Sequence, residues 1–169
     1  MQTVIVGIAD CQVSNDPACA LVTYALGSCI AVAIWDPVAR VGGLLHYMLP
    51  DSGIDGAKSR ERPYMFADTG VPLLFRRAYE LGAEKRRMLV RVAGGAQVMD
   101  DNGVFDIGRR NYLALRRILW QAGVLIHAED VGGTVSRSVR LEVPTGLMWL
   151  RTAGSAEREM PASRAARKA

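Results

Sequence analysis

Residues 20–49, ALVTYALGSCIAVAIWDPVARVGGLLHYML, decide the fold. Two breaks divide this stretch into three apolar runs: Gly27 and Ser28 after the first run, and Asp36 and Pro37 after the second. Apolar and β-branched runs between such breaks are typical of buried strands, and proline presets the backbone angle of a turn. We therefore expect three consecutive strands over 20–26, 29–35 and 41–49.

The rest of the chain extends this pattern with more strands than helices. Apolar runs predict a buried strand over 3–9 and further strands over 88–96, 124–130, 138–144 and 146–152. Helical spacing predicts helices over 64–82 and about 107–122; the second is expected to turn these residues toward the core: Ile107, Tyr112, Leu115, Leu119 and Trp120. Polar residues predict loops after 3–9 and over 50–63. The fold expected is α+β, a layered α/β sandwich of largely antiparallel sheet with two or three helices on one side.

Composition indicates one globular domain with a basic end. The chain has 169 residues, 50% of them hydrophobic, and a net charge of +4. Apolar periodicity stops after Ala153, so we expect a domain over 1–153 and a flexible basic tail over 154–169. Residues 1–150 are nearly neutral, and no aromatic residues interleave with the basic ones of the tail, which argues against a nucleic-acid-binding protein.

The N-terminus lacks the pattern of a secretory signal, and no apolar run reaches the roughly 18 residues that span a bilayer. We therefore expect a cytoplasmic protein without membrane insertion. The three cysteines, Cys11, Cys19 and Cys29, have no CxxC spacing, and only two histidines accompany them. No disulfide framework, metal site or cofactor is predicted.

Cys29 and His46 lie in neighbouring predicted strands. An even number of residues in the connection, either two or the four from Pro37 to Arg40, puts both side chains on one face of the sheet. A two-residue connection would place Cys29 and His46 directly opposite each other, and a four-residue connection would make them diagonal neighbours with roughly 7–8 Å between their Cβ atoms. A bulge at the glycines 42–43 would change this parity.

Such a pair has the chemistry of a nucleophile and its base. The imidazole could take the thiol proton, while the Thr23 hydroxyl or carbonyl could accept the other ring N–H and fix the tautomer. The turn at Gly27 and Ser28 would expose backbone N–H groups to a developing oxyanion. The alternative is that Cys29 and His46 are ordinary buried residues of two strands, which their apolar surroundings also fit.

The segment VTYALGSCIAVAIWDPVARVGGLLHYMLPDS resembles the signature of the chemoreceptor glutamine deamidase family, CheD. The resemblance continues through ADTG (67–70), AGGA (93–96), IGRRN (107–111) and AEDVGGTVSRSV (128–139), in the family's order. It covers about residues 3–152, and it implies a layered α/β sandwich. The family's catalytic cysteine, histidine and threonine fall on Cys29, His46 and Thr23.

The resemblance implies a cytoplasmic enzyme that hydrolyses selected glutamine side chains to glutamate on methyl-accepting chemotaxis receptors through a thioester. Ser28, Gly27 and Tyr47 are then expected near the oxyanion or substrate, with Ser28, Tyr47 and the 51–63 loop flanking the docked receptor helix. A CheC-type phosphatase is a further partner implied by the family, and the protein itself is expected to be a monomer. Two alternatives remain open, a noncatalytic chemotaxis adaptor and a cysteine hydrolase of other specificity such as a receptor methylesterase.

Overall fold

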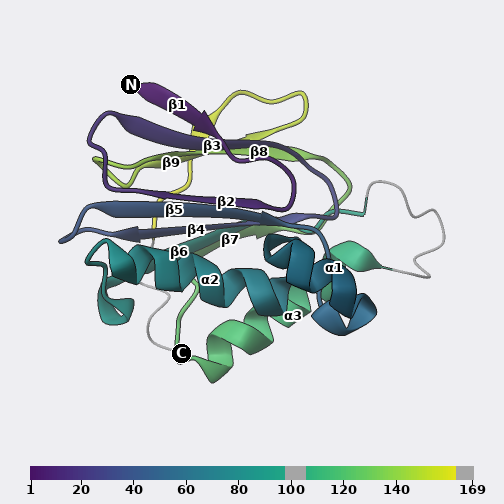
Figure 1. Cartoon of the computed structure of the whole chain (residues 1–169). Helices are drawn as coiled ribbons and strands as arrows, with labels where there is room; N and C mark the ends of the chain where they lie inside the picture. Colours follow the sequence, from purple (N-terminus) through teal and green to yellow (C-terminus); the bar gives the residue numbers. More distant parts are fainter. Residues whose placement is uncertain (98–105, 163–169) are drawn as a thin grey trace.

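The computed structural model describes residues 1–97 and 106–162. Within them the chain forms two five-stranded sheets and a layer of helices, stacked in three layers (Figure 1). The strands of the first sheet, in spatial order, are β1 (Gln2–Ile5), β3 (Cys19–Leu26), β8 (Arg137–Glu142), β9 (Met148–Thr152) and β10 (Arg158–Glu159). Those of the second sheet are β2 (Asp10–Ser14), β5 (Val41–Tyr47), β4 (Ile30–Asp36), β6 (Leu89–Gly94) and β7 (Ala128–Val131).

The helices cover only the outer face of the second sheet (Figure 1). They are α1 (Gly56–Glu61), α2 (Ala67–Glu80) and α3 (Ile107–Gln121), with short 3-10 turns η1 (Ser52–Ile54), η2 (Pro63–Met65) and η3 (Lys85–Arg87). All strand pairs are antiparallel except β1 with β3 and β6 with β7. The predicted α+β sandwich, with its helices on one side, is therefore confirmed.

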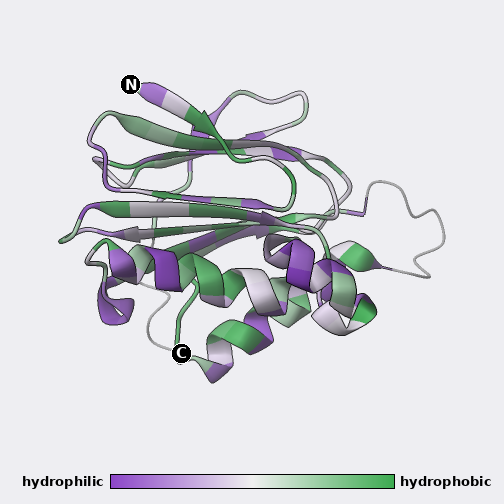
Figure 2. Cartoon of the chain, viewed as in Figure 1, coloured by the Kyte–Doolittle hydropathy of each residue, from purple (hydrophilic) through white to green (hydrophobic). Residues whose placement is uncertain are grey.

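Successive side chains of the central strands β4 and β5 point to opposite faces of the second sheet, so these strands contribute to two separate hydrophobic cores. Ile30, Val32 and Leu45 pack beneath the helices, whereas Ala31, Ala33 and Leu44 face the first sheet. Both faces of the second sheet are thus apolar, as expected for a sheet buried between two layers, and Figure 2 shows its central strands largely green. Burial on both sides makes this sheet a rigid support for any side chain placed between the layers.

The stretch 20–49 forms the three predicted strands, but they do not share one sheet. β3 belongs to the first sheet and β4 to the second, so Gly27, Ser28 and Cys29 carry the chain from one layer to the other. A register shift between Thr23 and Leu26 and the left-handed conformation of Ala25 (φ 56°) mark the point where β3 turns away. The crossover, rather than a hairpin, therefore places Cys29 at the junction of the layers.

Several sequence expectations were wrong in detail. The buried strand expected over 3–9 is a short and mostly exposed β1, and β2 lies within the predicted polar loop that follows. The loop over 50–63 contains α1, whose N-terminus is capped by the Asp55 carboxylate. The strand expected from 124 begins only at Ala128.

The predicted domain boundary at 153 is too early. β10 pairs with β9, and the Met160 side chain is buried in the core between the sheets. The backbone carbonyl of Met160 also accepts a hydrogen bond from the buried Arg91. The ordered domain therefore continues at least to Met160, and the flexible tail predicted from 154 is wrong for these residues; its last part, 163–169, lies outside the described residues.

Candidate active site

Cys29 and His46 lie on the same face of the second sheet, the face toward the first sheet. His46 pairs with Ala31, and the β4–β5 pairing runs without a break to the Asp36–Val41 pair. The connection is therefore the four-residue one, with no bulge. Continued one residue before the start of β4, this register makes Cys29 the diagonal neighbour of His46, one of the two arrangements that the sequence allows. Cys29 is half-buried, at the end of the core between the sheets.

His46 is held from the opposite sheet. Its Nδ1 lies 2.7 Å from the hydroxyl oxygen of Thr23, and both side chains are fully buried. The same hydroxyl lies 2.7 Å from the carbonyl oxygen of Val6, to which it donates. The structure thus brings Thr23, predicted from the preceding strand, to His46 across the two layers and not along one sheet.

This pair of contacts fixes the tautomer of His46. A threonine hydroxyl has one proton, and the Val6 carbonyl can only accept it. Thr23 must therefore accept the Nδ1–H of His46, which leaves Nε2 without a proton. Nε2 is buried and has no hydrogen-bond partner among residues 1–97 and 106–162. The Nε2 atom of His46 consequently carries a lone pair that can accept a proton.

Burial keeps both members of the pair uncharged. Burial lowers the pKa of His46 to about 4. It also raises the pKa of the Cys29 thiol above its ordinary value, an effect that the residue's own backbone N–H partly offsets. At neutral pH the resting pair is therefore a thiol and a neutral imidazole, and a thiolate arises only when the proton moves to His46.

The backbone around Cys29 is pinned on one side. The carbonyl oxygens of Gly27 and Cys29 accept hydrogen bonds from the backbone N–H groups of Ala96 and Gly95, each at 2.8 Å. The Ser28 carbonyl accepts one from the Asn111 side chain at 2.9 Å. Because C=O and N–H point in opposite directions in a trans peptide, the N–H groups of Ser28 and Cys29 are directed away from these partners.

Gly27 itself offers no such donor. Its N–H bonds to the Ala25 carbonyl at 3.1 Å. The oxyanion donors expected at this turn therefore reduce to the N–H groups of Ser28 and Cys29.

A glycine at position 94 permits this close packing. A Cβ on Gly94 would lie 2.2 Å from the carbonyl oxygen of Cys29, and the residue has φ +113°, where side chains are strained. The segment AGGA (93–96) is thus the floor on which the Cys29 turn rests.

Tyr47 does not flank the substrate. It points to the helical layer, opposite to His46, and its hydroxyl donates to the backbone carbonyl of Asn111 at 2.7 Å. Its side chain is fully buried, which raises its pKa well above the ordinary value. The expected docking role of Tyr47 is wrong; the residue holds α3 against β5.

Sequence reasoning missed Asn111, which is fully buried beside the site. The buried residues of α3 follow helical spacing: Gly108, Asn111, Leu115 and Leu119. That spacing and the motif IGRRN could have revealed a polar residue on the core-facing side. The expected core residue Trp120 is instead 82% exposed.

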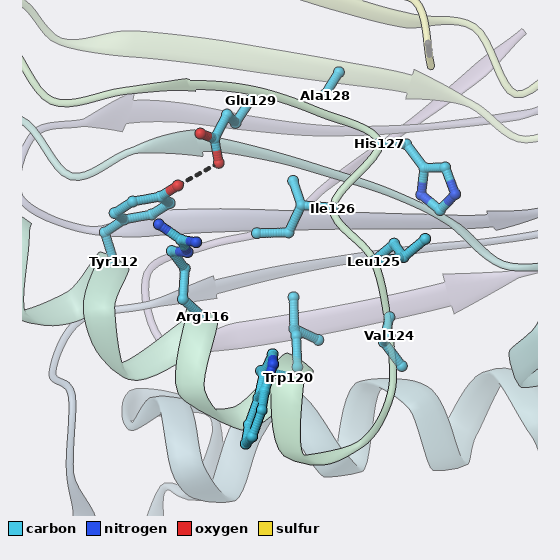
Figure 3. A pocket seen from close by; sticks show the side chains of 10 residues that line it. Tyr112, Arg116, Trp120, Val124, Leu125, Ile126, His127, Ala128 and Glu129 are labelled. Atoms are coloured by element: carbon cyan, nitrogen blue, oxygen red, sulfur yellow. Dashed lines mark hydrogen bonds between the residues drawn. The ribbon is translucent and has the colours of Figure 1, made fainter. Parts of the chain in front are cut away.

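A hollow lies beside the C-terminal half of α3 (Figure 3). Arg116 and Trp120 of α3 and Leu125 line it, and Tyr112 donates to the carboxylate of Glu129 at 2.5 Å there. None of Cys29, His46 and Thr23 lines it, so this hollow is not the candidate active site.

The described residues contain no cluster of metal-ligating side chains. Residues 1–97 and 106–162 contain no group of three or more His, Cys, Asp or Glu side chains placed to bind a metal ion. Cys11 and Cys19 are buried, and burial raises the pKa of Cys11 to about 12. Among the described helices, none combines the length and apolar character needed to cross a bilayer.

Comparison with known proteins identifies the family. The family model for CheD chemotactic sensory transduction matches residues 48–152. The probable chemoreceptor glutamine deamidase CheD of Solibacter usitatus is 56% identical over 161 residues, which are 95% of each chain. The chemoreceptor glutamine deamidase CheD of Thermotoga maritima is 39% identical over 153 residues, 90% of this chain and 94% of its own. The chain therefore belongs to the CheD family.

Proposed function

We propose that this protein hydrolyses glutamine side-chain amides to glutamate on chemoreceptors, with Cys29 as nucleophile and His46 as base. The names of its relatives support the reaction and the class of substrate. The observation that carries the roles is the Thr23 hydroxyl, which binds the Nδ1–H of His46 and so leaves Nε2 able to accept a proton. A base with this tautomer, diagonal to a cysteine on the same face, is what amide hydrolysis through a thioester needs.

The first half of the reaction forms the thioester. The Cys29 proton moves to His46 Nε2 as sulfur attacks the carboxamide carbon, and the carbonyl oxygen becomes an oxyanion. The N–H groups of Ser28 and Cys29 stabilise that charge. His46 then gives its proton to the amide nitrogen, the C–N bond breaks, and ammonia leaves.

The second half consumes water. His46 Nε2 takes a proton from a water molecule whose oxygen attacks the thioester carbon. The C–S bond breaks, the proton returns to sulfur, and glutamate is released. The net change is one amide and one water converted to one carboxylic acid and one ammonia. His46 needs a neutral resting state for both halves, and its lowered pKa provides it.

The cellular setting follows from the same proposal. An enzyme that acts on the cytoplasmic regions of receptors works in the cytoplasm. A CheC-type phosphatase as second partner and a monomeric state stay predictions of the family resemblance. No nucleic acid, cofactor or metal is required by the mechanism.

Mass spectrometry of a purified receptor cytoplasmic fragment tests the function. Incubation with the wild-type protein should convert specific glutamines to glutamates and release ammonia. The variant Cys29→Ala should do neither. Cys19→Ala, which changes a buried cysteine of the core that Cys29 packs against, should remain active. Deamidation by purified Cys29→Ala would remove the nucleophile assignment. Loss of methyl ester mass would indicate a methylesterase, and binding without any mass change would indicate an adaptor.

A further inference from the structure

Asn111 occupies a position where an apolar residue would be expected. It lies on the core-facing side of α3, in line with Leu115 and Leu119, and has no exposed surface. Asparagine is a weak helix former, and a buried amide costs stability unless its polar atoms are bonded. The presence of asparagine at this position is therefore to be explained by the contacts that it makes.

Those contacts join the two segments that hold the candidate nucleophile and base. One Nδ2 proton goes to the carbonyl of Ser28, the residue before Cys29, at 2.9 Å. The other goes to the carbonyl of Met48, two residues after His46, at 2.8 Å. The reverse orientation of the amide would place Oδ1 against two carbonyl oxygens, which is repulsive, so the donor assignment is firm.

The bond to Ser28 also sets a peptide plane. The Ser28–Cys29 peptide has its C=O directed at Asn111, so its N–H, that of Cys29, is directed the opposite way. That N–H lies by the residue's own sulfur, where it lowers the thiol pKa against the effect of burial. A donor beside the attacking sulfur is well placed for the oxygen of the carbon under attack.

Among the described residues that bind the backbone carbonyls of residues 27–29, only Asn111 does so through its side chain. The Gly27 and Cys29 carbonyls are bound by backbone N–H groups, which a side-chain substitution at Asn111 leaves in place. Substitution at Asn111 therefore releases the Ser28–Cys29 peptide selectively while the two flanking carbonyls stay bound.

We propose that Asn111 is a positioning residue for the deamidation: it orients the Cys29 N–H as an oxyanion donor and holds the Cys29 turn to the strand that bears His46. The inference rests on the proposed function. A positioning role and a purely structural role of Asn111 predict different results for two reactions of the Cys29 sulfur. Amide hydrolysis develops an oxyanion, whereas alkylation by iodoacetamide does not.

The test compares both reactions in Asn111→Leu and Asn111→Asp. Leucine preserves the apolar volume and removes both donors; aspartate preserves the shape and replaces the donors by acceptors. For each, kcat for deamidation of the receptor fragment should fall by about 10²-fold or more with KM changed by no more than about threefold. The rate constant for alkylation of the Cys29 thiolate, taken from the alkaline plateau of a pH–rate profile and read by peptide mass spectrometry, should stay within about threefold of wild type, because this reaction needs no oxyanion donor.

Leu113→Ala is the matched control, because Leu113 lies two residues along α3 and is exposed. It should leave both rates unchanged. A kcat within about threefold of wild type in Asn111→Leu would overturn the proposal. So would a parallel loss of deamidation and alkylation in both Asn111 variants, since that shows a general structural role. Failure of the proposed function is separate: it would appear as deamidation by Cys29→Ala while Asn111 variants still alkylate normally.

Discussion

The two histidines of the chain lie in regions that bury both rings but bind opposite ring nitrogens. Between the two sheets, His46 donates its Nδ1–H to Thr23 and keeps a lone pair on Nε2. Between the second sheet and the helices, His127 uses Nδ1 to accept the backbone N–H of Val90 at 3.0 Å. A neutral His127 therefore carries its proton on Nε2. The difference shows that the hydrogen bond a histidine makes, and not its depth of burial, decides which ring atom is available as a base.

Substitution of each histidine gives the largest contrast. His46→Gln should lower kcat for glutamine deamidation by about 10³-fold, because the general base is lost. His127→Gln should leave kcat within about threefold of wild type, since that ring binds backbone and lies outside the proposed site. Steady-state ammonia release from the receptor fragment measures both. Equal losses in the two variants would remove the distinction between the regions.

Glycine substitutions sharpen the same contrast through the backbone. Gly94→Ala drives a Cβ to 2.2 Å from the Cys29 carbonyl and should lower the free energy of unfolding by more than about 3 kcal/mol. Gly123→Ala, four residues before His127, meets nothing within 4 Å and suffers only from φ +70°, which costs about 1 kcal/mol. Urea unfolding of both variants measures the difference; a smaller cost at position 94 would contradict the close packing around Cys29.

The pH dependence of the free energy of unfolding measures the pKa shift of His46. Its pKa rises from about 4 in the folded protein to the ordinary 6.5 on unfolding, so the unfolded state binds more protons between these values. Stability is therefore complete above pH 6.5 and falls as the pH drops toward 4, by up to about 3 kcal/mol. His46→Gln should lack this component, and His127→Gln should retain it. Chemical unfolding at several pH values would disagree with the account if wild type and His46→Gln gave parallel curves.

Thr23 gives the smallest effect. Thr23→Val keeps the shape but removes the acceptor for His46 Nδ1–H, and kcat should fall about tenfold, as for the loss of one buried hydrogen bond. Thr23→Ser keeps the hydroxyl and should stay close to wild type. The ratio of the kcat values of the two variants measures the contribution of the hydroxyl. A valine variant as active as the serine variant would mean that the hydroxyl does not orient the ring.

The fold was predictable wherever both faces of an element carry strong patterns. The stretch 20–49 and the helices α2 and α3 were recognised because their apolar residues follow period two or helical spacing over many residues. β1, β2 and β10 were misread because they lie at sheet edges, where partners rather than sequence pattern decide pairing. The assignment of β3 and β4 to different sheets also depends on packing, since a short Gly-Ser break fits a hairpin and a crossover equally well.

The common face of Cys29 and His46 was predictable, but the residues that hold their segments in place were not. The spacing of Cys29 and His46 fixes a common face once the connection is even, and the structure has that connection. Their catalytic roles, and that of Thr23, stay predictions. Asn111 was missed because its partners, Ser28 and Met48, are more than sixty residues away in sequence and are contacted through backbone carbonyls, which leave no mark on residue type.

The most direct test of the central claim is the tautomer of His46, read from imidazole ¹⁵N chemical shifts by NMR at pH 7. With only two histidines, the spectrum of His127→Gln assigns both rings. We expect a neutral His46 with its proton on Nδ1, and a His127 with its proton on Nε2. A proton on Nε2 of His46, in either a neutral or a charged ring, would leave Cys29 without a base and contradict the account.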